Sequence, residues 1–81
     1  MIVKVNLFAA AKEIVGKRSV EFVLEDTATL GDLKQALVEQ HPSMMELLEV
    51  STFSVDQEYA LDDRALYHGV EIGLIPPVSG G

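Results

Sequence analysis

Cysteine is absent from this chain of 81 residues, and so is tryptophan. Without a thiol, the chain has no disulfide framework, no thiolate metal ligand and no thiol nucleophile, so any sulfur that it handles must be carried on another group. The sequence also lacks an apolar run of about 18 residues, the minimum for a membrane span, and it lacks a secretory signal pattern. These absences predict no membrane partner and a cytoplasmic location.

Positive charge is scarce as well, because 6 Lys and Arg residues stand against 13 Asp and Glu residues and give a net charge of −7. Nucleic acids and anionic membrane surfaces repel such a chain at long range, so no nucleic acid partner is expected either. A basic protein surface is the better electrostatic match. The alternative is that the acidic surface serves only solubility.

Length and composition predict one small domain. With 81 residues, 48% of them hydrophobic, the chain is long enough for a single core and too short for a second. Such a core leaves little room for a complete enzyme pocket. We expect a folded domain over residues 1–75 and an extended arm over residues 76–81.

Several segments alternate between apolar and polar residues, as strands with one buried face do. Three of them cover residues 2–8, 19–24 and 70–75. A further strand is predicted over residues 50–55, and a short one over residues 59–61. The side chains of these three segments that are expected to face the core are those of Val3, Val5, Leu7, Val20, Phe22, Leu24, Val70, Ile72 and Leu74.

Two helices are predicted among these strands. Residues 9–15 are rich in helix formers and precede Gly16, a suitable left-handed C-cap. The main helix begins after Thr29, which can cap its free amides together with Asp32, and it ends before Pro42. Its apolar stripe consists of Leu30, Leu33, Ala36 and Leu37.

Polar segments mark the remaining boundaries. The capping pattern recurs in residues 43–46 and predicts a further helical turn through Leu48. Turns are expected at residues 62–64 and 68–69. The element order indicates an α+β roll, in which one main helix packs across a mixed sheet of four to five strands and the first and last strands are neighbours.

Apolar residues are also predicted on the outer face of this sheet. Phe8 falls on the same side of the first strand as Asn6, and Ile75 falls on the same side of the last strand as Glu71. Together with Tyr59 they predict a patch for a partner protein. The alternative is that a loop or helix of the same domain covers each of them.

Metal binding is not predicted. His41 and His68 are the only histidines, and no cysteine completes a zinc set, so each is expected to be a solvated turn residue. Glu58, Asp62 and Asp63 lack the regular spacing and the central glycine of a calcium loop. They indicate an acidic surface turn.

The end of the chain combines a stiff neck with a thin tip. Proline restricts the base of this arm to extended conformations, and glycine has no Cβ, so the tip can enter a narrow channel of a partner. The arm reaches about 20 Å, enough to carry the carboxylate of Gly81 into a buried active site. We predict that Gly81 is the reactive group, and a frayed end without function is the alternative. The arm consists of Pro76, Pro77, Val78, Ser79, Gly80 and Gly81.

Four segments also carry a family likeness, namely Val5–Ala9, Thr29–Leu33, Val55–Tyr59 and Gly69–Gly81. With them the whole chain resembles the small, sulfur-carrier subunits of molybdopterin synthase. The ending Ile-Pro-Pro-Val-Ser-Gly-Gly is specific, because related ubiquitin-like sulfur carriers share Gly-Gly but usually lack the double proline. The resemblance implies a ubiquitin-like β-grasp fold.

The resemblance also implies chemistry at Gly81. In this family an E1-like adenylating enzyme uses ATP and magnesium to convert the terminal carboxylate to an acyl-adenylate, and sulfur from a donor then replaces AMP. The thiocarboxylate enters the large synthase subunit and gives its sulfur to a pyranopterin precursor, forming a dithiolene. The chain itself is therefore expected to be a carrier that binds no cofactor.

Partners follow from the same likeness. Phe8, Tyr59 and Ile75 match the hydrophobic surface that docks the adenylating enzyme and the large subunit, and two large and two small subunits make the expected heterotetramer. Departures from the family pattern at Asp56, commonly Asn, and at His68 and Val70, commonly acidic, bear on which partners are accepted.

Other functions stay open at this point. They are a ubiquitin-like protein modifier joined to lysines through Gly81, a sulfur carrier for thiamin thiazole, and a binding module with a disordered tail.

Overall fold

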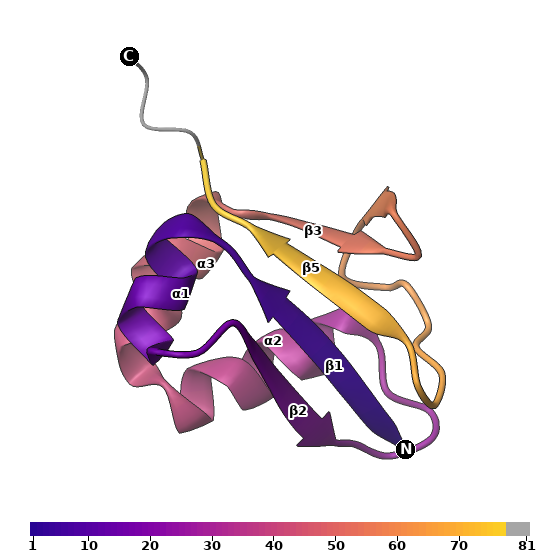
Figure 1. Ribbon diagram of the computed structural model, residues 1–81. Coiled ribbons are helices and arrows are strands. Elements are labelled where there is room, and N and C mark those ends of the chain that lie inside the picture. The colour runs from indigo at the N-terminus through magenta and orange to yellow at the C-terminus, as the bar shows by residue number, and fades with distance from the viewer. Residues whose placement is uncertain (78–81) are drawn as a thin grey trace.

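The computed structural model describes residues 1–77 of the chain. Within these residues the chain forms five strands and three α-helices, with a short 3-10 turn, Pro42–Met44, between the second and third helices. Figure 1 shows their arrangement. The strands are β1 (Ile2–Leu7), β2 (Ser19–Val23), β3 (Thr52–Val55), β4 (Glu58–Ala60) and β5 (Glu71–Ile75). The helices are α1 (Ala9–Val15), α2 (Leu30–Gln40) and α3 (Met45–Val50). No helix within residues 1–77 is long and apolar enough to cross a membrane.

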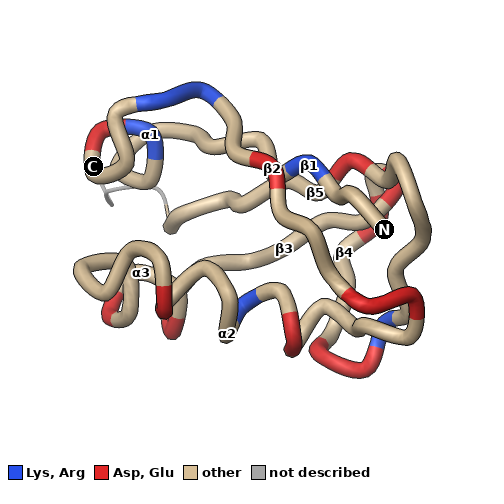
Figure 2. The backbone as a smooth tube through the Cα atoms, turned by 90° about the horizontal axis from the view of Figure 1, so that it is seen from below, with Lys and Arg blue, Asp and Glu red and all other residues tan. Residues whose placement is uncertain are grey.

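The strands form one mixed sheet in the order β2-β1-β5-β3-β4. β1 and β5 pair in parallel at its centre, and the remaining pairs are antiparallel. In Figure 2, α2 and α3 lie on one side of this sheet. The predicted α+β roll is therefore confirmed, with five strands and with the first and last strands as neighbours.

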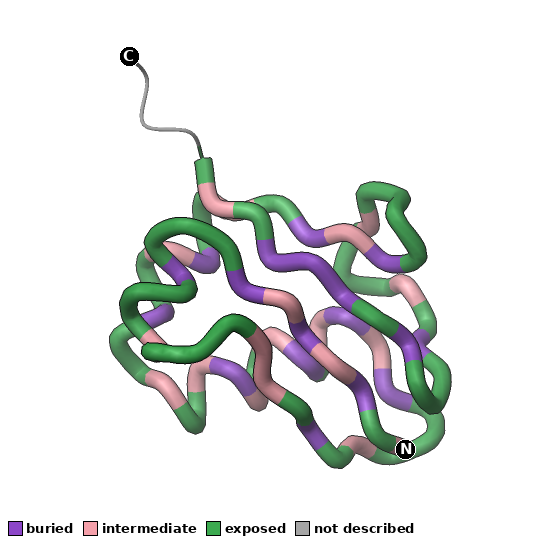
Figure 3. Tube along the Cα trace, in the orientation of Figure 1, coloured by how far each residue is buried: buried purple, intermediate pink, exposed green. Residues whose placement is uncertain are grey.

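The core lies between the sheet and α2. Val3, Val5 and Leu7 of β1 are buried, and Figure 3 shows buried residues along β5 beside them. Leu30, Leu33 and Leu37 of α2 have no exposed surface, as the helical spacing predicted, whereas Ala36 is only partly buried. Burying one such side chain contributes roughly 1.5–3 kcal/mol, so this apolar interface accounts for most of what holds α2 to the sheet. The predicted core residues Val70, Ile72 and Leu74 are buried as well.

Local signals for the helix ends are confirmed. The Thr29 hydroxyl accepts a hydrogen bond from the Asp32 amide, and the Asp32 carboxylate accepts one from the Thr29 amide, so a complete capping box starts α2. Gly16 closes α1 with φ of 81°, a left-handed conformation that glycine adopts without a steric penalty. His41 ends α2 before Pro42, as expected.

The predicted helical turn through Leu48 is confirmed as α3, but the prediction of a cap at Ser43 is wrong. Ser43 lies inside the 3-10 turn, and α3 begins at Met45 without a side-chain cap. Proline at the first position of a helical turn is preorganised for it, so Pro42 starts the turn directly after α2 ends. A new helical segment therefore starts at Pro42, one residue before the predicted cap.

Strand boundaries also differ from the prediction. β3 starts at Thr52, because Val50 is the last residue of α3. Leu48 of this helix is buried against the core, and such tertiary packing overrides the strand propensity of a β-branched residue. Phe8, which was expected within the first strand, follows β1 as the N-cap residue of α1.

Candidate functional site

The outer face of the sheet lies in front of β1 and β5 in Figure 1, where no helix of the described residues 1–77 covers these strands. Strand register places Asn6 beside Gly73, Gly73 beside Ser54, and Ser54 beside Tyr59, so one row of residues crosses four strands. Asn6 and Ser54 are half-buried and Tyr59 is exposed. The row forms the middle of an open surface.

Gly73 leaves space in this row for its neighbours. A Cβ atom at Gly73 would lie 2.6 Å from the Ser54 Oγ atom and 3.8 Å from the Phe8 Cε2 atom. The Phe8 ring and the Ser54 hydroxyl therefore close over the bare backbone, and Gly73 is buried although it lies on the outer face. The periodicity of β5 does not reveal this role, because a glycine in a strand can mark a bulge or a close approach but does not tell which residue approaches.

Phe8, Tyr59 and Ile75 lie around one shallow depression of about 380 Å³ on this face. Their side chains are 51%, 78% and 36% exposed, which is high for large apolar residues. The structure therefore brings Tyr59 together with Phe8 and Ile75, the two residues that strand alternation placed on the outer face. Within residues 1–77 no loop or helix buries these three side chains. We call these three residues the outer-face patch. Its role in docking stays a prediction.

The chain bends sharply beside Phe8. Ala9 has φ of 48°, in the left-handed region that costs a residue with a Cβ roughly 1–2 kcal/mol. This bend directs the chain from β1 into α1. The strained residue therefore lies next to the outer-face patch. Strained backbone is common at functional sites.

Polar contacts hold the turn between β3 and β4, on which Tyr59 depends. Asp56 and Gln57 have φ of 53° and 66°, so both central residues of this hairpin turn are left-handed, a conformation usually filled by Asn-Gly or Asp-Gly. The Tyr67 hydroxyl donates a hydrogen bond of 2.5 Å to Asp56 Oδ1. The Arg64 guanidinium lies 3.9 Å from Asp56 and 3.7 Å from Glu58.

These contacts explain how an aspartate serves at position 56. Its carboxylate accepts from Tyr67 and faces Arg64, which offsets the strain of the turn. The hydrogen bond to Asp56 raises the pKa of Tyr67 above its ordinary value of 10.0, and the neighbouring negative charge acts in the same direction. Sequence analysis missed this group, because Tyr67 and Arg64 carry no motif and meet Asp56 only in the fold.

The other departures noted in the sequence are also accommodated. His68 Nδ1 accepts a hydrogen bond of 3.0 Å from the Ile2 amide, and the Gly69 amide donates one of 2.8 Å to the Ile2 carbonyl. Val70 is buried in the core. These two hydrogen bonds fix the turn before β5 to the start of β1. His41 and His68 both lie at turns or helix ends, and within residues 1–77 no three His, Asp or Glu side chains gather as a metal site would require.

The arm leaves the sheet at the end of β5, next to the outer-face patch. Ile75 is the last residue of β5, Pro76 is half-buried and Pro77 is exposed. The proposed reactive residue Gly81, together with Val78, Ser79 and Gly80, lies outside the described residues.

Comparison with known proteins identifies the family. Residues 5–81 match the ThiS family. The chain belongs to this family. A molybdopterin synthase sulfur carrier subunit of Dictyostelium discoideum is 41% identical over 96% of this chain and 94% of its own length. The corresponding subunit of Chlamydomonas reinhardtii is 36% identical over the full length of both.

Solved structures of similar proteins agree with this family assignment. The crystal structure of SAMP1 from Haloferax volcanii superimposes with a TM-score of 0.92 at 31% identity and covers all of both chains. A complex of subunits 1 and 2 of the molybdopterin-converting factor from Helicobacter pylori contains a chain with a TM-score of 0.72 at 23% identity over the full length of both. That second likeness shows the fold alone. The ubiquitin-like β-grasp fold expected from the sequence is confirmed.

The space above Gly73 generates one prediction. Gly73→Ala lowers the free energy of unfolding by about 1 kcal/mol, because the new methyl group meets the Ser54 hydroxyl. In a Ser54→Ala background the same change stabilises the protein by about 0.4–1 kcal/mol, since alanine reduces the entropy of the unfolded chain. Urea unfolding of wild type, the two single variants and the double variant measures how far the two changes depart from additivity.

Thr52→Ala is the control background, because Thr52 lies beside Ile75 and not beside Gly73. If the effects of Gly73→Ala and Ser54→Ala on the free energy of unfolding are additive, the prediction is wrong.

The Tyr67–Asp56 hydrogen bond generates a second prediction, on pH. Because the folded-state pKa of Tyr67 lies above 10.0, its stabilising contribution is complete below that value and is lost as pH rises through the folded-state pKa. Tyr67→Phe is therefore less stable than wild type at neutral pH, and the difference shrinks above about pH 10. Denaturant unfolding at both pH values tests this. Tyr59→Phe is the control, because the Tyr59 hydroxyl makes no hydrogen bond among the described residues. A difference that is constant with pH refutes it.

Proposed function

We propose that this chain is the sulfur-carrier subunit of a molybdopterin synthase. The observation that supports this most is its full-length similarity to the sulfur carrier subunits of two organisms, at 41% and 36% identity. The site agrees with a carrier rather than with a complete enzyme. The outer-face patch is open and adjoins the base of the arm, and neither of them encloses a substrate.

The chemistry belongs to the carboxylate of Gly81. In the proposed cycle, an adenylating enzyme joins this carboxylate to the α-phosphate of ATP with loss of pyrophosphate. A sulfur donor at the oxidation level of sulfide then attacks the acyl carbon, and AMP leaves. The product is a thiocarboxylate, which is ionised near neutral pH and is a strong nucleophile, as thiolates are.

The large subunit supplies the pocket in this proposal. The thiocarboxylate sulfur bonds to a carbon of the cyclic pyranopterin monophosphate precursor, and an oxygen substituent leaves that carbon. Water then cleaves the acyl–sulfur bond, which leaves a thiolate on the precursor and returns the carboxylate of Gly81. A second carrier supplies the second sulfur of the dithiolene in the same way. Pro76 and Pro77 lower the conformational entropy lost when the arm inserts. The outer-face patch, at the base of the arm, docks both the adenylating enzyme and the large subunit, so the two partners bind in turn. The assembly contains two large and two small subunits.

A second function shares the activation step. The likeness to SAMP1, the small archaeal modifier protein 1 of Haloferax volcanii, favours a protein modifier that joins Gly81 to lysines by an amide bond. The two functions differ only in the nucleophile that attacks the activated carbonyl, which is the sulfur donor for a carrier and a lysine amine for a modifier. Target proteins distinguish them, because a modifier leaves a lysine-linked product that survives denaturing conditions.

Intact mass tests the first function. After incubation with ATP, magnesium, a cognate adenylating enzyme and sulfide, the chain gains the mass difference between sulfur and oxygen. A variant that lacks Gly81 shows no gain in mass. A mass gain of the full chain together with none in this variant excludes a binding module with an inert tail. An unchanged mass of the full chain, with an enzyme that is active on its own carrier, refutes the proposal. Lysine-linked products in place of dithiolene formation support the modifier, and sulfur delivery only to a thiazole precursor supports the thiamin pathway.

Docking is tested by substitutions in the outer-face patch. Phe8→Ala and Tyr59→Ala each weaken binding to the large subunit by about 10- to 100-fold, because a large apolar side chain at the centre of an interface is worth roughly 2 kcal/mol. Titration calorimetry with the purified large subunit measures the affinity. Val23→Ala is the matched control, since Val23 is 82% exposed but pairs with Ile2 at the other end of β1. Equal effects of Val23→Ala and Phe8→Ala contradict docking at the patch.

A further inference from the structure

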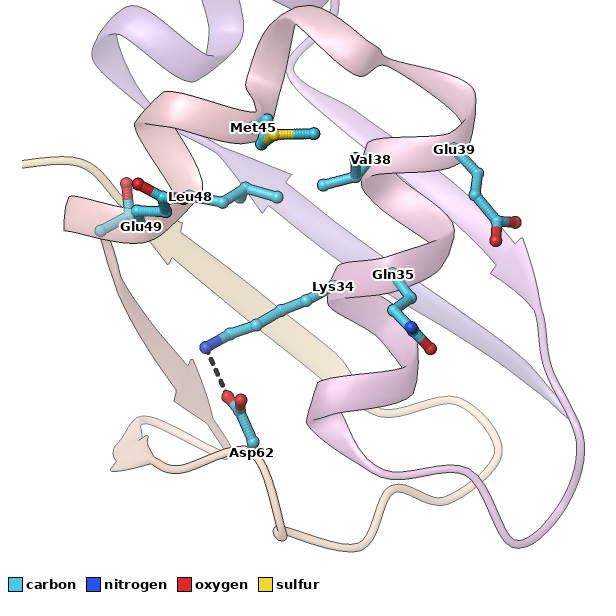
Figure 4. A pocket seen from close by; sticks show the side chains of 9 residues that line it. Lys34, Gln35, Val38, Glu39, Met45, Leu48, Glu49 and Asp62 are labelled. Atoms are coloured by element: carbon cyan, nitrogen blue, oxygen red, sulfur yellow. Dashed lines mark hydrogen bonds and ion pairs between the residues drawn. The ribbon is translucent and has the colours of Figure 1, made fainter.

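A second open surface lies on the helical side of the molecule, away from the outer-face patch. A groove of about 550 Å³ runs between α2 and α3, a volume in the range of roughly 300–1,000 Å³ typical of binding sites. Figure 4 shows Val38 of α2 and Met45 of α3 pointing toward each other across this groove, with Leu48 beside them. None of the proposed steps at Gly81 uses these residues.

The floor of the groove is apolar and open. Leu48 is buried, Val38 is half-buried, and Met45 is 52% exposed. An unbranched methionine adapts its shape to different partners, and such side chains are common at surfaces that bind amphipathic segments. Because Met45 is only partly covered within residues 1–77, the groove leaves apolar surface in contact with water. Burial of this surface by a partner is favourable.

Two carboxylates flank this apolar floor. Glu39 of α2 and Glu49 of α3 lie at opposite sides of it in Figure 4, and neither has an ion-pair partner among the described residues. The one lysine in the groove, Lys34, is already engaged. Its Nζ atom lies 2.5 Å from Asp62 Oδ1 and 5.0 Å from the centre of the Phe53 ring.

The groove is therefore negatively charged in a chain that is itself acidic. The charge of Lys34 is neutralised by Asp62, which leaves Glu39 and Glu49 uncompensated. A second copy of this chain, with a net charge of −7, is repelled from such a surface. A ligand with apolar groups and positive charge is attracted to it.

We propose that the groove between α2 and α3 binds a basic amphipathic helix of a partner protein. α2 is about 16 Å long, which accommodates the roughly 10 Å span of apolar anchors at positions i, i+3 or i+4, and i+7. These anchors contact Val38, Met45 and Leu48, and Lys or Arg residues on either side pair with Glu39 and Glu49. This site is independent of the outer-face patch and of the chemistry at Gly81, because the sheet separates the two surfaces.

The probe is a helical peptide of about 14 residues that contains only leucine and lysine, with leucine at the helical spacing. Added to the isotope-labelled full chain, it shifts the amide resonances of residues in α2 and α3 and leaves those around Phe8 and Tyr59 unchanged. A peptide with glutamate in place of lysine is the matched probe and does not bind. Shifts confined to the outer-face patch overturn the proposal.

Charge reversals separate a built site from general attraction. Glu39→Lys combined with Glu49→Lys weakens peptide binding about tenfold. The control combines Glu13→Lys with Glu46→Lys, which changes the net charge equally at exposed positions outside the groove and weakens binding less than twofold. Equal weakening by both pairs shows non-specific attraction and overturns the proposal.

A change of the apolar floor completes the test. Met45→Ala weakens binding about fivefold, because it removes apolar surface that the peptide buries. Val50→Ala on the same helix has no effect, since Val50 is 61% exposed but does not line the groove. Both positions are exposed, so the variants fold. Equal affinities of the two variants, or self-association of the chain that Met45→Ala abolishes without peptide, overturn the proposal.

Discussion

The parallel pairing of β1 with β5 is the constraint on which the rest of the structure depends. It joins Lys4 to Glu71 and Leu7 to Leu74 at the centre of the sheet, across almost the whole length of the chain. Because the two strands run in the same direction, their carboxyl ends lie at the same edge. Phe8, which follows β1, therefore lies near Ile75, from which the arm departs.

This pairing also separates the two faces of the molecule. Alternate residues of β1 and β5 enter the core against α2, and the residues between them form the outer face. On that face Gly73 has no side chain, which leaves room for the Phe8 ring and the Ser54 hydroxyl above its backbone. Under the proposed function, this arrangement places the outer-face patch next to the base of the arm.

Backbone strain occurs at two turns beside strands of the same sheet, and side-chain contacts offset it at one of them. Ala9, Asp56 and Gln57 adopt left-handed conformations without being glycine. At the β3–β4 turn the strain is offset by the contacts of Tyr67 and Arg64 with Asp56. The hairpin that carries Tyr59 is thereby held in place by groups that come from a later loop.

The sequence by itself determined the elements and most of the core. Alternation identified the buried residues of β1 and β5, the Thr29 capping box located α2, and Gly16 ended α1, because these signals depend on neighbours within a few residues. The predicted cap at Ser43 was wrong because Pro42 starts the helical turn. The predicted strand start at Val50 was wrong because packing of Leu48 extends α3 beyond its local signals.

Only the tertiary structure decided which distant residues meet. The position of Phe8 above Gly73 depends on the register of the sheet. The group formed by Asp56, Arg64 and Tyr67, and the groove between α2 and α3, depend on how separate segments pack against one another. Strand alternation placed Phe8 and Ile75 on the outer face, but their common depression with Tyr59 required the order β1-β5-β3-β4. The physical reason is that periodicity acts over a few residues, whereas such contacts form between segments that are adjacent only after the sheet has assembled.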